Sequence, residues 1–106
     1  MVRLSKNQLN LISVSLPLPN GLKVVLLDIG GRRDISLVEH NSNIYCIDGL
    51  GDVRWQIQAG ATIQERDSFV SISASEDGLL YADRFFGNEF IVNPENGLAT
   101  HVGWHK

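Results

Sequence analysis

The sequence has only one cysteine, Cys46, and no long apolar run. A single cysteine cannot form an internal disulfide, which excludes the class of small secreted domains held by disulfides and fits a reducing compartment. No stretch approaches the roughly 20 apolar residues that span a bilayer. The N-terminal apolar segment is interrupted by polar residues and precedes no clear cleavage site, unlike a signal peptide. We therefore predict a soluble, cytoplasmic protein.

Neither sign of charge dominates the composition. The chain carries 9 basic and 12 acidic residues, which gives a formal net charge of −3. No segment is polybasic, so we expect no binding to nucleic acid or to an anionic membrane. The 106 residues suffice for one domain with a modest core, and we expect a single all-β domain over residues 1–106.

Helical periodicity is also lacking, whereas apolar and polar residues alternate through most of the chain. In the segment around Val14, for example, Ser13 and Ser15 separate the apolar residues. Turn residues recur every eight to twelve residues or so, a spacing typical of all-β domains. We predict an antiparallel meander of about eight or nine strands, at residues 10–18, 22–29, 34–39, 43–48, 53–57, 69–75, 79–84, 88–93 and 98–104.

When the sequence is compared with itself after a shift of 45 residues, the strands and turns of its first part align with those of its second part. Tyr45 falls on Phe90, for example, and the match extends backwards without a gap. Because a slip of one residue would move every side chain to the other face of a strand, this shared register is informative. It predicts two four-stranded repeats, at about residues 22–58 and 67–104, with an additional strand at about residues 10–18.

The shared register also predicts one common buried face. Leu37→Ala should then lower stability by about 2–5 kcal/mol. The residues expected on this face are Val25, Leu27, Ile35, Leu37, Tyr45, Ile47, Val53, Ile57, Val70, Ile72, Leu80, Phe90, Val92 and Leu98.

Three arrangements would hide the apolar faces of such a meander. Two sheets can face each other in a sandwich, or one sheet can curl into a barrel. In the third arrangement, the repeats are two propeller blades that further copies of the chain complete. Ser71, Ser73 and Ser75 leave one face of their strand polar, which argues against blades covered on both sides.

Two segments carry a resemblance to a known family. IYCIDGLGDVRW and EFIVNPENGLATHVGW each contain an alternating strand followed by Asp or Asn and a Gly-containing turn. They resemble the blade motif of quinoprotein-type β-propellers over about a third of the chain, although no quinoprotein cofactor residue has a counterpart here. A two-blade chain also resembles small lectins that complete a propeller by trimerising. The whole chain is similar to short uncharacterised bacterial proteins, including those of mobile gene cassettes.

Two glycine-containing turns invite a ligand-binding interpretation. The turn from Asp48 to Asp52 carries carboxylates but lacks the run of oxygen ligands of a calcium loop. Gly and Asp are also what tight hairpins need, so we interpret this turn as structural. The Gly30-Gly31-Arg32-Arg33 segment resembles a phosphate loop superficially. Because we expect a strand after it rather than a helix, we predict an exposed basic hairpin tip.

The sequence presents no catalytic or metal-binding constellation, and we expect neither a cofactor nor a metal. His101 and His105 would lie about 13 Å apart on a strand, too far to share one ion, and His40 falls in a polar turn. Cys46 lies mid-strand and is interpreted as a small buried hydrophobe rather than a nucleophile. The remaining carboxylates of interest are interpreted as solvated turn residues: Glu65, Asp67, Glu76, Asp77 and Asp83.

The turn Arg84-Phe85-Phe86-Gly87 is the strongest binding signal. Its counterpart in the first repeat, residues 39–42, is wholly polar. Adjacent aromatic rings on a short turn cannot both face one core. Either they cover the open end of the fold, or they anchor a ligand or a protein partner together with Arg84. We expect a homodimer with this turn at or near the contact.

Three functions are compatible with these observations. The absence of a catalytic constellation favours a non-catalytic binding or protein-interaction module that is oligomeric. The alternative is a protein that binds a small molecule or carbohydrate through an aromatic-lined site built from Trp55, Trp104, Phe85 and Phe86. A small enzyme would need a histidine near Cys46 or a carboxylate in a cleft, and we rank it last.

Overall fold

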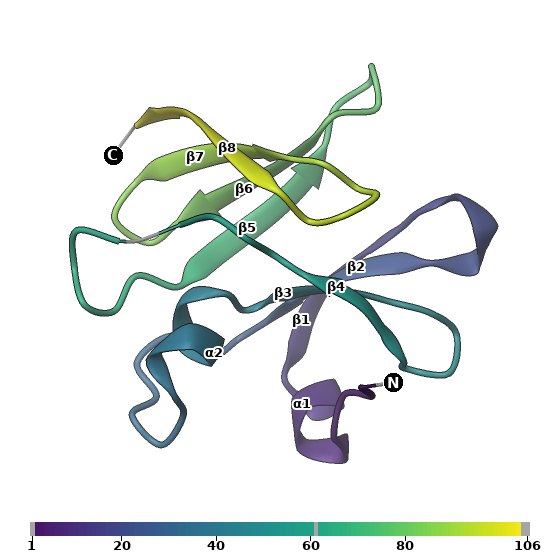
Figure 1. Ribbon diagram of the computed structural model, residues 1–106, viewed down its shortest axis with the longest axis horizontal. Coiled ribbons are helices and arrows are strands. Elements are labelled where there is room, and N and C mark those ends of the chain that lie inside the picture. Colours follow the sequence, from purple (N-terminus) through teal and green to yellow (C-terminus); the bar gives the residue numbers. More distant parts are fainter. Residues whose placement is uncertain (1, 61, 105–106) are drawn as a thin grey trace.

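Eight strands form two four-stranded sheets in the computed structural model, which describes residues 2–60 and 62–104 (Figure 1). Both sheets are antiparallel meanders in which each strand pairs with its neighbour in the sequence. The first contains β1 (Ile12–Pro17), β2 (Lys23–Leu27), β3 (Ile44–Ile47) and β4 (Val53–Gln56). The second contains β5 (Phe69–Ala74), β6 (Leu80–Arg84), β7 (Asn88–Val92) and β8 (Ala99–Trp104). The prediction of an antiparallel all-β meander is confirmed, and the described strands close no barrel.

The two sheets pack face to face around a shared core. Both contribute about equally to it, because alternate residues of the inner strands point toward the opposite sheet. Its buried members are Val24, Leu26, Ile44, Cys46, Trp55, Ile57, Phe69, Ile72, Leu80, Ala82, Phe90 and Val92.

The first sheet has a second apolar cluster on its outer face. Residues of β2 and β3 that point away from the second sheet are covered by the N-terminal segment and by the β2–β3 connection. Its buried members are Leu4, Val25, Leu27, Ile29, Tyr45 and Ile47. Both faces of β2 and β3 are therefore buried, and their burial does not follow the alternation expected of a strand with one solvated face.

Short helices flank the first sheet. Helix α1 (Lys6–Asn10) precedes β1, and a 3₁₀ turn, η1 (Pro19–Gly21), lies in the β1–β2 hairpin. The strand predicted at residues 34–39 is wrong, because helix α2 (Leu37–Asn41) occupies this part of the chain. The Ser36 hydroxyl caps α2 by accepting a hydrogen bond of 3.2 Å from the Glu39 N–H. This cap stabilises a helix in a segment whose alternation of apolar and polar residues favours a strand.

The 45-residue shift matches the structure only in the second half of each sheet. It places β3 on β7 and β4 on β8, which occupy equivalent positions. It places β2 on β5, however, whereas the strand equivalent to β2 is β6. Residues 28–43 connect β2 to β3, but residues 85–87 suffice between β6 and β7. The strand expected as an addition at residues 10–18 is therefore β1, the first strand of its sheet.

The predicted common face is correspondingly mixed. Some of its members lie in the shared core, namely Ile57, Ile72, Leu80, Phe90 and Val92. Others belong to the outer cluster of the first sheet, namely Val25, Leu27, Tyr45 and Ile47. Leu37, Val70 and Leu98 are exposed. The expected loss of stability in Leu37→Ala consequently has no basis in the structure.

Asn43 ties the two sheets together from within. Its buried amide Nδ2 donates hydrogen bonds to the Leu27 carbonyl (2.8 Å) and to the Phe69 carbonyl (2.9 Å). Its Oδ1 accepts a hydrogen bond of 2.8 Å from the Phe69 N–H. One side chain thus satisfies backbone groups where β2 ends and where β5 begins.

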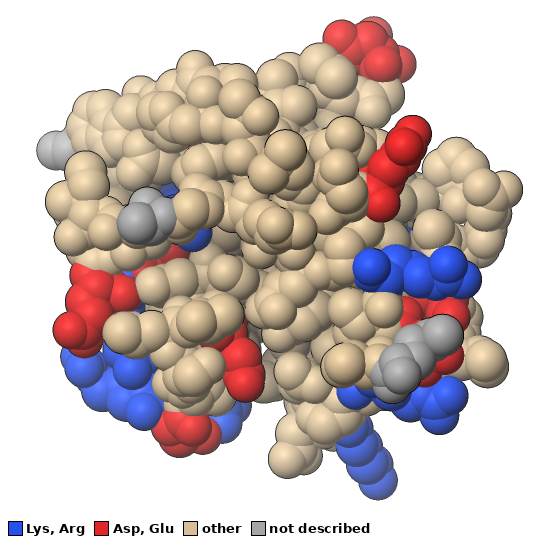
Figure 2. Space-filling model, in the orientation of Figure 1, with Lys and Arg blue, Asp and Glu red and all other residues tan. Residues whose placement is uncertain are grey.

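Charged side chains are unevenly distributed over the surface. On the face shown in Figure 2 they gather around the first sheet and its connections, and they leave the surface over β7 and β8 largely uncharged. No helix in the described part of the chain is long and apolar enough to cross a membrane.

Candidate functional site

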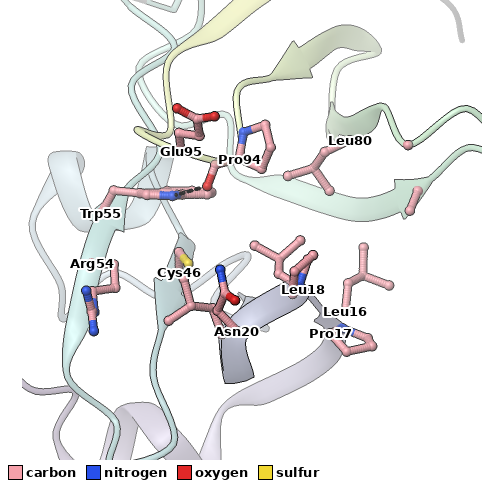
Figure 3. A pocket seen from close by; sticks show the side chains of 14 residues that line it. Leu16, Pro17, Leu18, Asn20, Cys46, Arg54, Trp55, Leu80, Pro94 and Glu95 are labelled. Carbon is pink, nitrogen blue, oxygen red and sulfur yellow. Dashed lines mark hydrogen bonds between the residues drawn. The ribbon is translucent and has the colours of Figure 1, made fainter.

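A cleft of about 770 Å³ opens between the two sheets at the end formed by the hairpin turns (Figure 3). The β1–β2 hairpin forms one wall, and the β5–β6 and β7–β8 turns lie across from it. Most of the lining side chains are apolar. They include Leu16, Leu18, Cys46, Trp55, Ala74 and Leu80.

Trp55 forms the wall of the cleft where the two sheets meet. Its indole Nε1–H donates a hydrogen bond of 2.8 Å to the Pro94 carbonyl in the β7–β8 turn. The ring lies so close to Gly97 that a Cβ there would be 2.5 Å from the Trp55 Cε3 atom. Gly97 also has φ of +79°, a conformation that favours glycine. Trp55 therefore links the two sheets, and its ring also forms part of the apolar wall of the cleft.

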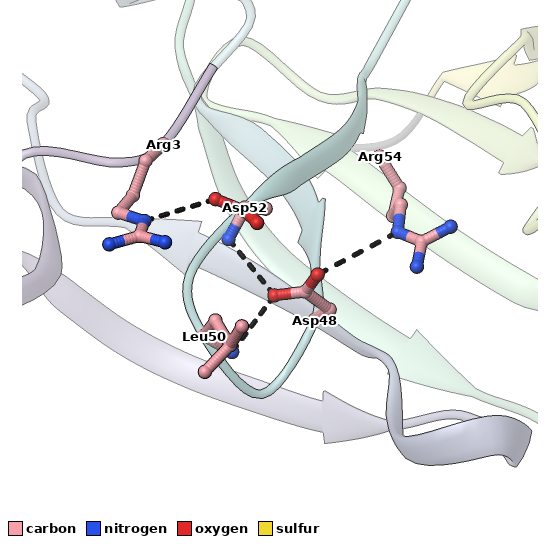
Figure 4. Close-up of polar contacts among 5 residues, drawn as sticks. All are labelled: Arg3, Asp48, Leu50, Asp52 and Arg54. Atoms are coloured by element: carbon pink, nitrogen blue, oxygen red, sulfur yellow. Dashed lines mark hydrogen bonds and ion pairs between the residues drawn. The ribbon is translucent and has the colours of Figure 1, made fainter. Parts of the chain in front are cut away.

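Polar groups lie at the mouth of the cleft. Arg54 and Glu95 line it next to Trp55, as Figure 3 shows, and both residues are exposed. The Arg54 Nε is 3.9 Å from the Asp48 Oδ2, so the arginine also contacts the β3–β4 turn (Figure 4). The mouth can thus meet a polar group of a ligand whose apolar part enters the cleft.

The β3–β4 turn uses its carboxylates for structure. The Asp48 Oδ1 accepts hydrogen bonds from the Leu50 N–H (2.8 Å) and the Asp52 N–H (3.0 Å), as Figure 4 shows. The first of these bonds contributes most to holding the pKa of Asp48 below its ordinary value. The Asp52 Oδ1 accepts a 3.0 Å hydrogen bond from the Arg3 Nε. These contacts agree with the interpretation of the turn as a structural hairpin.

Cys46 lies on the cleft wall but is fully buried. Burial raises the pKa of its thiol, and the Arg54 charge opposes this shift to a smaller extent. A raised pKa keeps the thiol protonated, and no histidine is among the described residues that line the cleft. The geometry is that of a small buried hydrophobe.

Arg84 lies inside the fold and not at the surface beside the phenylalanine rings. The residue is 4% exposed, and its guanidinium carbon is 4.7 Å from the Phe69 ring centroid and 5.3 Å from that of Phe90. Its Nη2 donates a 3.0 Å hydrogen bond to the Asn41 carbonyl. Burial lowers the pKa of Arg84, while the charge of Asp67 raises it. Arg84 therefore packs inside the fold beneath the Phe85–Phe86 turn and is not part of its exposed surface.

Phe85 and Phe86 are at the surface, so neither ring covers the open end of the fold. They are 69% and 42% exposed and meet edge to face, with ring centroids 5.2 Å apart. Trp104, which is 59% exposed, donates a 2.8 Å hydrogen bond from Nε1 to the Phe86 carbonyl. Ile63 completes a shallow hollow of about 430 Å³ with these three aromatic residues. The structure thus brings Trp104 to the Phe85–Phe86 turn, whereas Trp55 lies in the cleft.

The predicted solvated role of Asp67 is wrong, because this carboxylate is buried. Its Oδ1 accepts a 3.1 Å hydrogen bond from the Phe86 N–H and so holds the aromatic turn. His101 contacts Asn88 at 2.9 Å, and His105 lies outside the described residues. Among residues 2–60 and 62–104, no group of three or more His, Cys, Asp or Glu side chains could hold a metal ion.

Sequence reasoning missed the cleft itself. Its aliphatic lining comes from the β1–β2 hairpin, and Leu16 and Leu18 read as ordinary strand residues. The prolines at 17 and 19 predict a turn but do not indicate that the turn faces a second sheet. The burial of Arg84 could have been predicted from the sequence, since Arg84 continues the inward alternation of Leu80 and Ala82 along β6.

One of three comparisons with known proteins identifies a family, and it leaves the function of that family open. Neither the curated proteins nor the solved structures contain a match to the chain. One family model matches residues 10–104, a segment that includes all eight strands and every residue of the cleft. The chain therefore belongs to the family described as a domain of unknown function, DUF7957.

Proposed function

We propose that this protein is a non-catalytic binding module that takes a small, largely apolar ligand in the cleft between its sheets. The cleft itself carries this proposal. Its volume of about 770 Å³ lies in the range of small-molecule sites, which are typically apolar with a few polar groups. The walls are backed by the shared core and by the Trp55–Pro94 hydrogen bond, so the site is formed before a ligand arrives.

The distribution of polar groups favours an apolar ligand over a carbohydrate. A sugar needs several convergent donors and acceptors, because each buried hydroxyl without a partner weakens binding. The charged groups of the cleft, Arg54 and Glu95, lie at its mouth, and the Trp55 N–H is already bonded to Pro94. A ligand with an apolar body and one polar end fits this arrangement.

The proposal can be tested with N-phenyl-1-naphthylamine, a neutral fluorescent probe that brightens in apolar sites. Ala74 and Ser73 are neighbours on β5, and their side chains point to opposite faces of the sheet. Ala74 lines the cleft, so Ala74→Trp should fill it and reduce probe affinity by at least about tenfold. Ser73→Trp is the matched control and should leave the affinity unchanged.

Equal probe binding by the two variants would contradict the proposal. Absence of probe binding to the parent protein would contradict it as well. Circular dichroism should show the same β content in both variants, because each position is exposed and a larger side chain displaces no core residue.

A second candidate function is self-association through the aromatic hollow. Ile63, Phe85, Phe86 and Trp104 place four exposed apolar side chains around one depression. Soluble monomers seldom keep large apolar patches, and a symmetric dimer would cover the same patch on both copies. This observation supports the expected homodimer with the Phe85–Phe86 turn at the contact.

The solution mass tests this second candidate. The parent chain should sediment as a dimer, and the double variant Phe85→Ser/Phe86→Ser should sediment as a monomer. Because both rings are exposed, the variant should keep the circular dichroism of the parent. A monomeric parent chain would refute the dimer.

A further inference from the structure

A second cavity, of about 570 Å³, lies at the opposite end of the sheets from the cleft. It forms where the β2–β3 connection meets the β6–β7 turn and the segment before β5. Its wall combines basic and aromatic side chains, and no acidic residue is among the described residues that line it. The residues that matter here are Arg33, His40, Arg66, Ser68, Phe85 and Phe86.

The two arginines of this cavity have no acidic partner. Arg32, their neighbour outside the cavity, pairs with Asp34 at 2.9 Å, whereas neither Arg33 nor Arg66 forms an ion pair with another described residue. The Arg66 Nη1 donates a 3.2 Å hydrogen bond to the Arg32 carbonyl, which fixes the guanidinium beside the cavity. The Arg66 Nε is buried and lacks a hydrogen-bond partner within the described structure. A buried donor without a partner is unfavourable, so the site is incomplete as it stands.

His40 contributes a second incomplete group. The ring is buried, and its Nδ1 lies 2.8 Å from the Asn41 Oδ1. The Asn41 amide is oriented by its Nδ2, which donates to the Glu65 carbonyl, and by its Oδ1, which accepts from the Asp67 N–H. The Nδ1 must therefore carry the proton, and the buried Nε2 has no partner among the described residues. With the proton on Nδ1, the Nε2 can accept a hydrogen bond from a hydroxyl.

Aromatic rings border the same cavity. Phe85 and Phe86 hold an edge-to-face pair on a turn whose backbone is fixed, since the Phe85 N–H donates to the Ser68 carbonyl and the Phe86 N–H to Asp67. Gly30 keeps the opposite wall open, because a Cβ at this position would lie 3.3 Å from the Ser68 Oγ. The cavity thus offers a ring surface beside two cations and a hydroxyl.

We propose that this cavity binds an aryl phosphate, whose monoanion carries anionic oxygens and a hydroxyl on one group beside an aromatic ring. The anionic oxygens lie against the guanidinium groups of Arg33 and Arg66, and a protonated oxygen of the same phosphate donates to the His40 Nε2. The aromatic part contacts Phe85 and Phe86 in the edge-to-face or offset geometry that rings prefer. The proposal concerns a site separate from the cleft and does not depend on the ligand proposed there.

Phenyl phosphate is the probe for this site, titrated into the full chain by calorimetry and by NMR. Arg33→Met and Arg66→Met should each weaken binding by about tenfold or more, because a charged hydrogen bond is lost. Arg3→Met removes an exposed arginine of the N-terminal segment, which lines neither the cleft nor this cavity, and should bind phenyl phosphate as the parent does. Inorganic phosphate should bind at least about tenfold more weakly than phenyl phosphate, since it cannot contact the rings. The His40 Nε2 resonance should shift on binding, while that of His101 should not.

The proposal is overturned if phenyl phosphate does not bind at millimolar concentration, or if inorganic phosphate binds equally well. It is also overturned if Arg3→Met weakens binding as much as the variants of the cavity do. Arg33 is exposed, so Arg33→Met keeps the test valid even if loss of the Arg66–Arg32 contact disturbs the loop.

Discussion

The two sheets share one topology but protect their outer faces differently. The outer face of the first sheet is apolar and is covered by the chain itself, through the N-terminal segment and the long β2–β3 connection. The outer face of the second sheet is mostly polar, with Ser71, Ser73 and Glu89, and its apolar Ile91 is half-buried. The connection between equivalent strands is therefore long where it covers an apolar face, and a tight turn where the outer face is mostly polar.

This difference bears on the propeller-blade arrangement. In a ring of blades, each sheet packs against a neighbour on both of its faces. Here the first sheet has its outer face filled by Leu4, Leu11 and Ile35 of the same chain, and the second has polar side chains outside. Both observations favour a sandwich, in which the two sheets of one chain cover each other. They argue against propeller blades that need further copies of the chain.

The largest expected effect comes from truncating the covered outer face. Leu27→Ala removes a buried side chain from the outer cluster of the first sheet and should lower the free energy of unfolding by about 3–5 kcal/mol. Ile91→Ala, at a half-buried position on the outer face of the second sheet, should lower it by about 1 kcal/mol or less. Urea denaturation measures both values. Equal losses would show that the two outer faces are equally important and would break the comparison.

Contact between the sheets can be broken at Gly97. Gly97→Ala places a Cβ against the Trp55 ring in a backbone conformation with φ of +79°, and should lower stability by about 2–4 kcal/mol. Gly78→Ala is the matched control, because its φ is +85° but no atom lies within 4 Å of the added Cβ. The difference between the two thermal or urea midpoints isolates the clash from the backbone strain. If the two variants are equally stable, Trp55 does not hold the sheets together.

The repeat itself supplies a third test, at Asn43 and Asn88. Asn43→Ala leaves the buried Phe69 N–H without a partner and should lower stability by about 1–3 kcal/mol. Asn88, its counterpart under the 45-residue shift, is only partly buried and contacts His101. Asn88→Ala should change stability by about 0.5 kcal/mol or less. A larger loss in Asn88→Ala would mean that the repeat is energetically symmetric.

The smallest expected effect is a pH dependence at the β3–β4 turn. The backbone hydrogen bond from Leu50 lowers the pKa of Asp48 in the folded state, so its charged form stabilises the fold above the unfolded pKa of about 3.9. This contribution is lost as the pH falls through the folded pKa. Asp48→Asn should therefore lower the thermal midpoint at about pH 5, and the gap to the parent should close toward about pH 2. A gap that stays the same from about pH 5 to about pH 2 would contradict this role of the Asp48 carboxylate.

Several features of the fold could be predicted from the sequence. Alternation and turn residues indicate the eight strands and their antiparallel meanders, because side-chain period and turn chemistry are local properties. The segment around Leu37 could not be assigned by the same rule, since its alternation is outweighed by the Ser36 cap of α2. Because a strand is expected there, the segment from Gly30 to Arg33 is interpreted as a hairpin tip. In the structure, residues of this segment line the second cavity.

The candidate sites were predictable only in part. Exposed rings at Phe85 and Phe86 follow from their place on a short turn, and Trp104 joins them through a hydrogen bond that no spacing reveals. The cleft depends on how the ends of two sheets meet, which is a tertiary property. The unpartnered atoms of His40 and Arg66 likewise result from packing between segments far apart in the sequence.

The nearest-neighbour pairing of all eight strands has a consequence for how the chain folds. Each strand can find its partner by closing a short loop, except across residues 28–43, so little loop entropy is lost at each step. Folding rates fall as contacting residues become more distant in sequence, and a meander keeps them close. We therefore expect faster folding than for sandwiches whose sheets exchange strands, with each meander forming first. Docking of Asn43 onto Phe69 joins the two halves and should come late along the folding pathway.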